Sequence, residues 1–315
     1  MERGVAKKPT ARMSVRASLR TFTFALACLN AGLAYAGDVD ADSAAALHAK
    51  YGVVRGQLSQ NQFQKPLYLE SGEASDSVTG DIYALINSPF VTASGALVSA
   101  ANWCDIMMLH LNTKYCRASI ANQQDVLNVR IGKKYDQPLS DAYPVVFSYR
   151  VAAQMPTYLR VQLKADEGPL STRDYRIVLE AVPLDSGQTF MRLSYSYGYG
   201  MAGRLAMHAY LGTIGRNKVG FTIAGKQTNG ESLHIGGMRG LVERNTMRYY
   251  LAIEAYLGAL SLPPHARLEK SLRDWFTGIE RYPRQLHELE QNQYLDMKRK
   301  EFLRQQAEPA VKAQG

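Results

Sequence analysis

Two cysteines in the middle of the chain are spaced so that a covalent bond between them is feasible. Of the three cysteines, Cys28 lies within the N-terminal 36 residues, which leaves Cys104 and Cys116 in the rest of the chain. In a protein that leaves the cytoplasm, such an even number permits a disulfide. A bridge over so short a loop contributes at most about 3 kcal/mol. The sequence leaves two alternatives open, a Cys104–Cys116 disulfide, which we expect, and two buried thiols. His110 lies between them, but no four-ligand set accompanies it, so we expect no metal.

A glycine pattern follows the last predicted strand. Residues 198–203 read Gly-Tyr-Gly-Met-Ala-Gly and match G-x-G-x-x-G, which between a strand and a helix is typical of dinucleotide-binding folds. Here the preceding strands form an antiparallel meander, and no acidic residue ends the next predicted strand to bind a ribose. We therefore expect a turn where backbones approach closely, and no cofactor. Anion binding beside Arg204 at the start of the next helix is the alternative.

Charged pairs and histidines show no catalytic pattern. Arg173–Asp174 and Glu243–Arg244 lie on predicted polar faces or at element ends, where surface ion pairs are expected. The histidines lack motif spacing, and the sequence has no G-x-S-x-G, H-E-x-x-H or P-loop motif. Catalysis is left open, with no catalytic residue assigned, and a noncatalytic role is favoured.

The N-terminal segment has the three parts of a secretory signal peptide. Six basic residues precede Thr21–Leu33, which is uncharged and mostly apolar, and Ala34-Tyr35-Ala36 has the small-x-small pattern of a cleavage site. We expect cleavage after Ala36 and a periplasmic location. An uncleaved anchor is the alternative, and Met13 is an alternative start.

Removing this leader changes the charge of the protein. The whole chain carries +9, and the leader, with six basic residues and one acidic residue, carries +5, which leaves +4. So small an excess is weak support for nucleic-acid binding, and we expect no nucleic acid as a partner.

A change of hydrophobic period indicates the elements that must position any site. Residues 78–86 suit a strand and residues 90–108 have helical spacing. Five segments with alternating apolar residues then follow, joined by short turns, as in an antiparallel sheet with one buried face: 127–131, 145–151, 159–163, 175–181 and 191–199. A helix, a strand and a polar loop are predicted next, at residues 201–214, 218–224 and 227–237. The longest helical stripe, residues 238–260, ends before Pro263-Pro264.

Residues 84–103 carry a recognisable order of signals. An apolar strand ends at Asn87-Ser88-Pro89-Phe90, a helix contains Ala96-Leu97, and Ala101-Asn102-Trp103 closes the segment. With the meander and the long final helix, this order resembles the helix-grip superfamily, which includes START-like lipid-transfer domains and polyketide-cyclase-like proteins. The resemblance implies an α+β fold in which a curved antiparallel sheet wraps around a long C-terminal helix. An inserted helix and strand in residues 200–236 and an extra helical tail depart from the minimal pattern.

Five parts follow from these signals: a signal peptide (1–36), a polar lead-in arm (37–77), the helix-grip domain (78–262), a helical tail (263–306) and a disordered end (307–315). The tail alternates charges, with Trp275, Phe276, Tyr282 and Tyr294 among them. We expect a solvated helix that packs its aromatics on the domain. Contact with an envelope protein or a membrane surface is the alternative.

The resemblance also implies a cavity between the sheet and the long helix, with few polar groups in an apolar lining. Tyrosines suit an amphipathic ligand because each has an apolar ring and one hydroxyl. Taken singly, each lining residue is expected to fill the core; taken together, a cavity and a filled core are equally open. The predicted lining consists of Phe147, Tyr149, Tyr175, Met191, Tyr195, Tyr197, Asn245, Tyr249, Ile253 and Tyr256.

The function expected from these features is noncatalytic binding of a lipid or another amphipathic hydrophobic molecule in the periplasm. Two alternatives stay open. One is an enzyme of the cyclase or hydrolase kind that uses the same cavity, and the other is an envelope scaffold whose tail binds a partner protein.

Overall fold

The computed structural model describes residues 31–213 and 218–307. The chain divides into two compact units, residues 1–39 and 40–315. Of the first unit only residues 31–39 are described, and they form the start of helix α1 (Ala31–Ser59). The predicted signal peptide lies mostly outside the described residues, as does nearly all of the predicted disordered end, so both stay predictions. Among the described residues, no helix combines the length and the apolar character needed to span a membrane.

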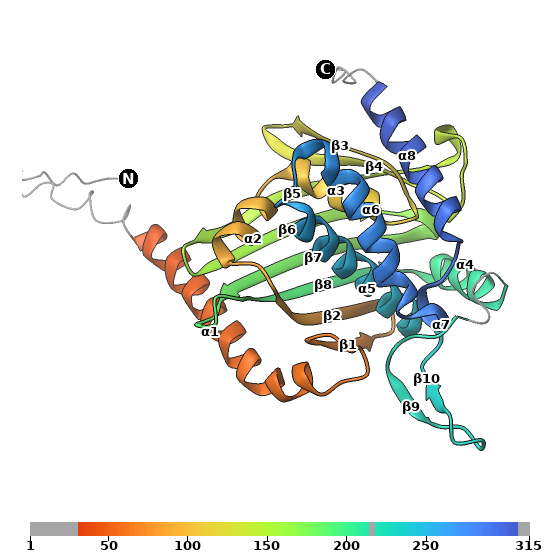
Figure 1. The fold of residues 1–315 in the computed structure, drawn as a ribbon, viewed down its shortest axis with the longest axis horizontal. Coiled ribbons are helices and arrows are strands. Elements are labelled where there is room, and N and C mark those ends of the chain that lie inside the picture. The colour runs from red at the N-terminus through yellow and green to blue at the C-terminus, as the bar shows by residue number, and fades with distance from the viewer. Residues whose placement is uncertain (1–30, 214–217, 308–315) are drawn as a thin grey trace, which may run out of the picture. The chain divides into compact units, whose positions relative to one another are not determined.

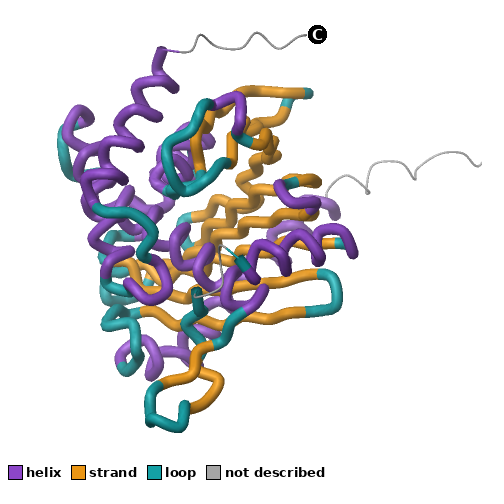
Figure 2. Tube along the Cα trace, turned by 90° about the vertical axis from the view of Figure 1, so that its right-hand side faces the viewer, coloured by secondary structure: helices purple, strands orange, loops and turns teal. Residues whose placement is uncertain are grey.

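Eight antiparallel strands form one sheet in the order β1-β2-β8-β7-β6-β5-β4-β3 (Figure 1). Alternation explains its buried face: in β6, Leu159, Val161 and Leu163 are buried, whereas Arg160 and Gln162 between them are half-exposed. The strand directions change steadily from one edge of the sheet to the other (Figure 2). The strands are β1 (Leu67–Glu73), β2 (Ser77–Ile86), β3 (Thr113–Ala121), β4 (Gln124–Ile131), β5 (Tyr143–Met155), β6 (Tyr158–Glu167), β7 (Thr172–Pro183) and β8 (Thr189–Tyr199).

The long helix α5 (Gly237–Ala259) packs on the inner face of the sheet against β1, β2 and β8. Strand β2 pairs with β8, so the first strand of the predicted domain closes the meander that β3 to β8 form. This is the predicted helix-grip arrangement, and the α+β fold with an antiparallel sheet around a long helix is confirmed.

Two short helices replace the single helix predicted at residues 90–108. They are α2 (Phe90–Leu97) and α3 (Ala100–Leu109), and Ser99 caps α3 by accepting a hydrogen bond from the Asn102 backbone nitrogen at 3.3 Å. The predicted disulfide between Cys104 of α3 and Cys116 of β3 is present, with the two Cα atoms 5.1 Å apart. It fastens the helices to the edge strand of the sheet.

The stretch predicted as a polar arm contributes to the domain. Helix α1 packs Leu47, Val54 and Leu58 on the outer face of the sheet, in a cluster that includes Tyr158 and Phe190. Strand β1 pairs along its whole length with β2, so the sheet begins before residue 78. The alternating residues of β1 were not predicted to form a strand because polar residues flank them on both sides.

The insertion after β8 differs from the prediction in its second half. Helix α4 (Met201–Gly212) is as predicted, but the strand predicted at residues 218–224 is wrong over most of its length. The buried Glu243 carboxylate accepts hydrogen bonds from the Phe221 and Thr222 backbone nitrogens at 2.6 and 3.0 Å, which holds this segment as a loop on α5. A hairpin of β9 (Ile223–Lys226) and β10 (Ser232–His234) follows, with a turn at Gly230, where φ is +86°. β9 begins at the end of the predicted strand, and β10 lies within the predicted polar loop.

The helical tail is part of the core. Its helices are α6 (Pro264–Glu280), α7 (Pro283–Leu286) and α8 (Gln291–Ala307), and α6 packs on α5 whereas α8 packs on β3. Trp275 and Tyr294 stack with ring centroids 4.8 Å apart, and all five tail aromatics, Phe302 included, are buried. These aromatic residues therefore face the domain rather than a partner, and contact between the tail and an envelope partner stays a prediction.

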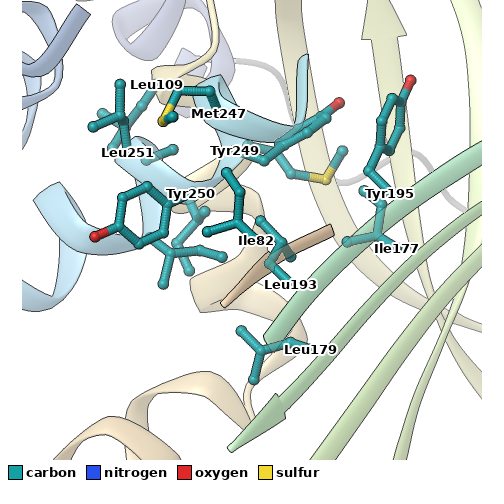
Figure 3. Close-up of a cluster of buried hydrophobic side chains, with 14 of the residues drawn as sticks. Ile82, Leu109, Ile177, Leu179, Leu193, Tyr195, Met247, Tyr249, Tyr250 and Leu251 are labelled. Atoms are coloured by element: carbon teal, nitrogen blue, oxygen red, sulfur yellow. The ribbon is translucent and has the colours of Figure 1, made fainter. Parts of the chain in front are cut away.

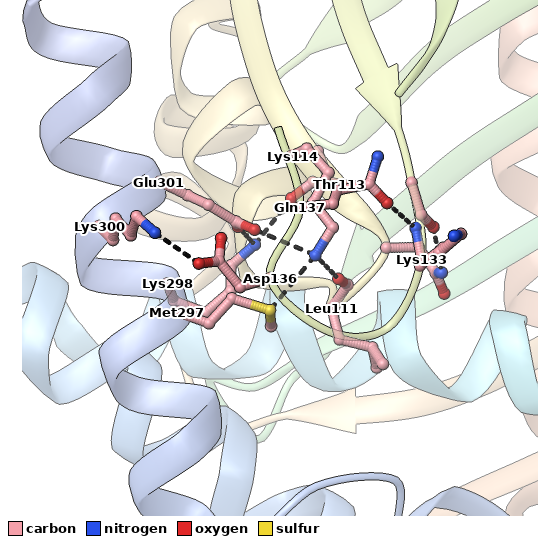
Figure 4. Close-up of polar contacts among 12 residues, drawn as sticks. Leu111, Thr113, Lys114, Lys133, Asp136, Gln137, Met297, Lys298, Lys300 and Glu301 are labelled. Atoms are coloured by element: carbon pink, nitrogen blue, oxygen red, sulfur yellow. Dashed lines mark hydrogen bonds and ion pairs between the residues drawn. The ribbon is translucent and has the colours of Figure 1, made fainter. Parts of the chain in front are cut away.

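A buried ion network fastens α8 to β3 (Figure 4). Lys114 Nζ donates to Glu301 Oε1 at 3.0 Å, and Lys298 Nζ donates to Glu301 Oε2 at 2.5 Å and to the Thr113 carbonyl at 2.7 Å. Burial lowers the pKa of Lys298 to about 8, although Glu301 opposes this shift. One carboxylate thus balances two buried ammonium groups.

We predict that Glu301→Gln lowers the free energy of unfolding by about 3–5 kcal/mol, because it leaves two buried charges uncompensated. The matched control is Asp136→Asn, which removes the exposed partner of Lys300 and is expected to cost less than about 1 kcal/mol. Urea unfolding of both variants checks the difference. Equal stability of the two variants would show that the network does not hold the tail.

Candidate functional site

Five of the predicted lining residues form a continuous group of rings, which we call the tyrosine cluster: Phe147, Tyr175, Tyr195, Tyr197 and Tyr249. Tyr175 stacks on Tyr197 with ring centroids 5.3 Å apart, and Tyr195 lies 5.3 Å from Tyr249 of α5. Phe147 meets Tyr175 edge-to-face at 6.5 Å. Tyr195 and Tyr249 project from β8 and α5 in Figure 3. The sequence therefore identified a set of aromatic residues that meet between sheet and helix.

Tyr175 joins this group through the regular alternation of β7. Ile177 pairs with Tyr195 and Arg176 with Ser196, so Tyr175 continues the same register opposite Tyr197 and the two rings stack across the strand pair. The pairing shifts only on the N-terminal side of this contact, between Arg173 and Arg176, where Asp174 adopts φ 54°. Simple alternation predicts the inward face of β7 but not this local shift.

The other predicted lining residues have different surroundings. The Tyr149 hydroxyl donates to the Leu97 carbonyl at 3.1 Å and so ties β5 to the end of α2. Met191 and Ile253 are fully buried in the main core, and Tyr256 is half-buried. These four residues belong to the packed core and are not members of the tyrosine cluster.

The hydroxyl groups of the cluster are held neutral by burial. Burial raises the pKa of Tyr175 to about 12 and raises the pKa values of Tyr195, Tyr197 and Tyr249 further. For Tyr195, burial is the largest cause of the raised pKa, and a hydrogen bond with the Asn245 side chain partly opposes this rise. The Tyr197 hydroxyl is buried without a hydrogen-bond partner among the described residues. At neutral pH the cluster offers neutral hydroxyl groups and apolar ring faces.

His110 lies beside this cluster, with its ring centroid 5.0 Å from that of Tyr249. Its Nδ1 accepts a hydrogen bond from the Asn112 backbone nitrogen at 3.2 Å. Burial, followed by the charge of Arg248, lowers the pKa of His110 well below its ordinary value, so the ring is neutral. It contributes another polar edge to an otherwise apolar surface.

Sequence reasoning missed a second group next to the tyrosines, which we call the basic cluster: Lys134, Lys218, Arg244 and Arg248, together with Glu288. Glu288 Oε1 accepts from Lys134 Nζ at 2.5 Å and from Arg248 Nη2 at 2.8 Å, and Lys218 Nζ lies 3.9 Å from Oε2. Arg244 donates to the Val219 carbonyl at 3.2 Å. The spacing of Arg244 and Arg248 one turn apart on the buried helix was a usable signal, but the lysines come from distant loops.

The two clusters are linked through Asn245. Its Oδ1 accepts from Arg248 Nη1 at 3.4 Å, and its side chain also hydrogen-bonds the Tyr195 hydroxyl. The predicted lining residue Asn245 is thus the junction between the rings and the cations.

A hollow of about 300 Å³ opens where β8 ends and α4 begins. Tyr199, Arg204, His208 and Met238 line it with residues 73–75, and none of the ten predicted lining residues borders it. The Tyr199 ring is 6.5 Å from that of Tyr197, so the hollow adjoins the tyrosine cluster.

The glycine pattern at residues 198–203 has a packing role here. A side chain at Gly203 would come within 2.7 Å of the Ser171 carbonyl oxygen, which explains why this position needs glycine. Among the described residues, no group of three or more histidine, cysteine or acidic side chains is arranged to hold a metal ion.

The two charged pairs considered in the sequence have structural roles. Arg173 and Asp174 form an exposed contact at 3.6 Å. Glu243 binds the loop at Phe221 and Thr222, and its Oε1 also accepts from Ser71 at 2.6 Å. The surface ion pair expected for Glu243–Arg244 is therefore wrong, because both side chains are buried, and Arg244 belongs to the basic cluster.

No family model matches this sequence, and no curated protein is similar to it at a significant level. Solved structures are similar only weakly. A conserved protein from Geobacillus kaustophilus has 9% identity and a TM-score of 0.33 over 57% of this chain and 95% of that chain. A norcoclaurine synthase mutant from Thalictrum flavum has 12% identity and a TM-score of 0.32 over 45% and 91%. Ara h 8.0201 has 10% identity and a TM-score of 0.32 over 61% and 99%. The helix-grip assignment rests on the strand order and the place of α5.

We predict that Tyr195→Phe destabilises the protein more than Tyr197→Phe, although the two changes are chemically identical. Tyr195 loses a hydrogen bond and leaves Asn245 with one partner fewer, which costs about 1–3 kcal/mol, whereas the Tyr197 hydroxyl has no partner to lose. Urea unfolding of the ligand-free variants measures the difference. A larger loss for Tyr197→Phe would contradict the assignment of its hydroxyl as unpaired.

Proposed function

We propose that this protein is exported to the periplasm and there binds, without catalysis, a lipid or another amphipathic hydrophobic molecule between the sheet and α5. One observation carries the proposal: the rings of the tyrosine cluster share a buried site with an unpaired hydroxyl, that of Tyr197. A buried hydroxyl without a partner is costly, and a polar group on a bound molecule satisfies it. The aromatic rings supply the apolar contact that such a molecule needs.

Binding requires the rings to separate. Tyr175 and Asn245 are the half-buried members of the group, and the hollow beside Tyr199 adjoins it, so a ligand entering there meets Tyr197 first. Aromatic contacts of this kind contribute about 0.5–1.5 kcal/mol each beyond the effect of burial. Separating the rings loses this energy, and a ligand that makes equivalent contacts restores it.

Export is supported by the leader pattern in residues 1–36 and is consistent with the Cys104–Cys116 disulfide, since such bonds persist in oxidising compartments. We predict that the protein isolated from the periplasmic fraction begins at Gly37 and carries no free thiol. N-terminal sequencing and intact mass after alkylation without reductant check both points. A cytoplasmic product with the leader attached and two alkylated cysteines would contradict this part of the proposal.

We predict that the protein purified as residues 37–315 carries a hydrophobic molecule, which organic extraction followed by mass spectrometry identifies. Tyr197→Leu keeps an apolar side chain but removes the ring and hydroxyl, and we expect it to lower the affinity for the extracted molecule about tenfold. The control is Tyr68→Leu, which alters a ring on the outer face of the same sheet near Lys50 and leaves the affinity unchanged.

Two outcomes would contradict the proposal. If no extracted or added amphiphile binds, the site is a packed core. If the bound molecule is converted into a product at a rate that Tyr197→Leu abolishes, the protein is an enzyme that uses the same site.

A further inference from the structure

Among the described residues, the basic cluster combines four cationic side chains with one carboxylate, that of Glu288. Lys134, Lys218 and Arg248 share the two Glu288 oxygens, and Arg244 is within electrostatic reach of both lysines. Glu243, next to Arg244 in sequence, is engaged elsewhere, because its oxygens accept hydrogen bonds from Phe221, Thr222 and Ser71. Arg248 is buried and Lys134 and Lys218 are about one-fifth exposed, so this charge lies in a poorly solvated place.

Burial and the neighbouring cations lower the pKa values of both lysines. Burial is the largest of the effects that lower the pKa of Lys134, and the charge of the neighbouring Arg248 lowers this pKa further. Burial likewise lowers the pKa of Lys218, with Lys134 and Arg248 adding to the effect after the opposing influence of Glu288. An additional anion placed among these groups opposes the effect of the neighbouring cations.

The position of this charge relative to the rings suggests what the anion is. Asn245 links Arg248 to Tyr195, and His110, which lies against Tyr249, is within electrostatic reach of Arg248 and Lys134. A molecule whose apolar part lies on the tyrosine cluster therefore presents one end to the basic cluster. Lys134 and Lys218 retain enough exposure for that end to reach them.

We propose that the basic cluster binds the anionic head group, a carboxylate or a phosphate, of the same amphipathic ligand. This inference rests on the proposed function and specifies its ligand class: a negatively charged amphiphile rather than a neutral one. Charge-assisted hydrogen bonds from lysine and arginine to such oxygens are about twice as strong as neutral ones. Arg248 and Asn245 position the head group, and Lys134 and Lys218 close over it.

The test compares amphiphiles that share one chain and differ in the head: dodecanoate, dodecyl phosphate and dodecanol, measured by calorimetry with residues 37–315. We expect both anions to bind at least about tenfold more tightly than dodecanol, and their advantage to shrink as salt is raised. Inorganic phosphate alone is expected to bind far more weakly than dodecyl phosphate. Equal binding of these two phosphates would show that the cluster takes a free anion and would overturn the assignment of a lipid head group.

Two charge variants give opposite expectations. Lys134→Gln lowers the affinity for dodecanoate about tenfold, and Glu288→Gln raises it, while dodecanol binding stays unchanged in both. Lys133→Gln is the matched control, since it removes the same charge from the exposed neighbour on the same loop and leaves all affinities unchanged. Because the two expected changes in dodecanoate affinity have opposite signs, poor folding, which only lowers affinity, cannot produce both.

The outcomes separate the two proposals. If dodecanol binds as tightly as dodecanoate, or if the charge variants change both equally, the head-group assignment fails while ligand binding at the tyrosine cluster stands. If none of the three amphiphiles binds, the proposed function fails with it.

Discussion

The packing of α5 on the inner face of the sheet determines where the other features of this protein lie. The helix runs for 23 residues and buries side chains on most of its circumference, against β1, β2 and β8 on one side and α6 on another. That contact brings Tyr249 over Tyr195 and directs Arg244 and Arg248 toward the loops that carry Lys134 and Lys218. A helix buried on so many sides is held mainly by tertiary contacts, because its own sequence includes charged residues that favour solvent.

The surrounding elements keep α5 in place. The disulfide fixes α3 to the edge strand β3, and the Lys114–Glu301–Lys298 network fixes α8 to the same strand. The Trp275 indole donates to the Arg248 carbonyl at 3.1 Å, which joins the tail to the helix at the level of the basic cluster. The tail that the sequence presents as an appendage is therefore one wall of the structure around the site.

Much of the fold was predictable from the sequence because local periodicity reports it directly. The five alternating segments after Cys116 and the stripe of α5 correspond to real elements, and the tyrosines meet because alternation assigns them to one face. Strand β1 was missed because Leu67 and Leu69 alternate within a polar stretch, and the segment around Phe221 was misassigned because Glu243, distant in sequence, holds it.

The basic cluster could not be predicted from local sequence patterns for a related reason. Its members come from the β4–β5 connection, the segment before β9, α5 and the residues after α7, and each alone reads as a surface charge. Only long-range packing brings them together, so no spacing rule along the chain identifies them. The same holds for the bulge between Arg173 and Arg176 in β7, since a one-residue shift leaves no signal in the hydrophobic pattern.

The central claim is that a ligand occupies the space between the sheet and α5, among the tyrosine rings. The most direct measurement is an NMR experiment on residues 37–315 with bound dodecanoate that records nuclear Overhauser contacts between the alkyl chain and tyrosine ring protons. The account predicts contacts from the chain to Tyr195, Tyr197 and Tyr249. Contacts confined to rings of the outer face, such as Tyr68 and Tyr83, with unchanged signals for the cluster, would contradict it.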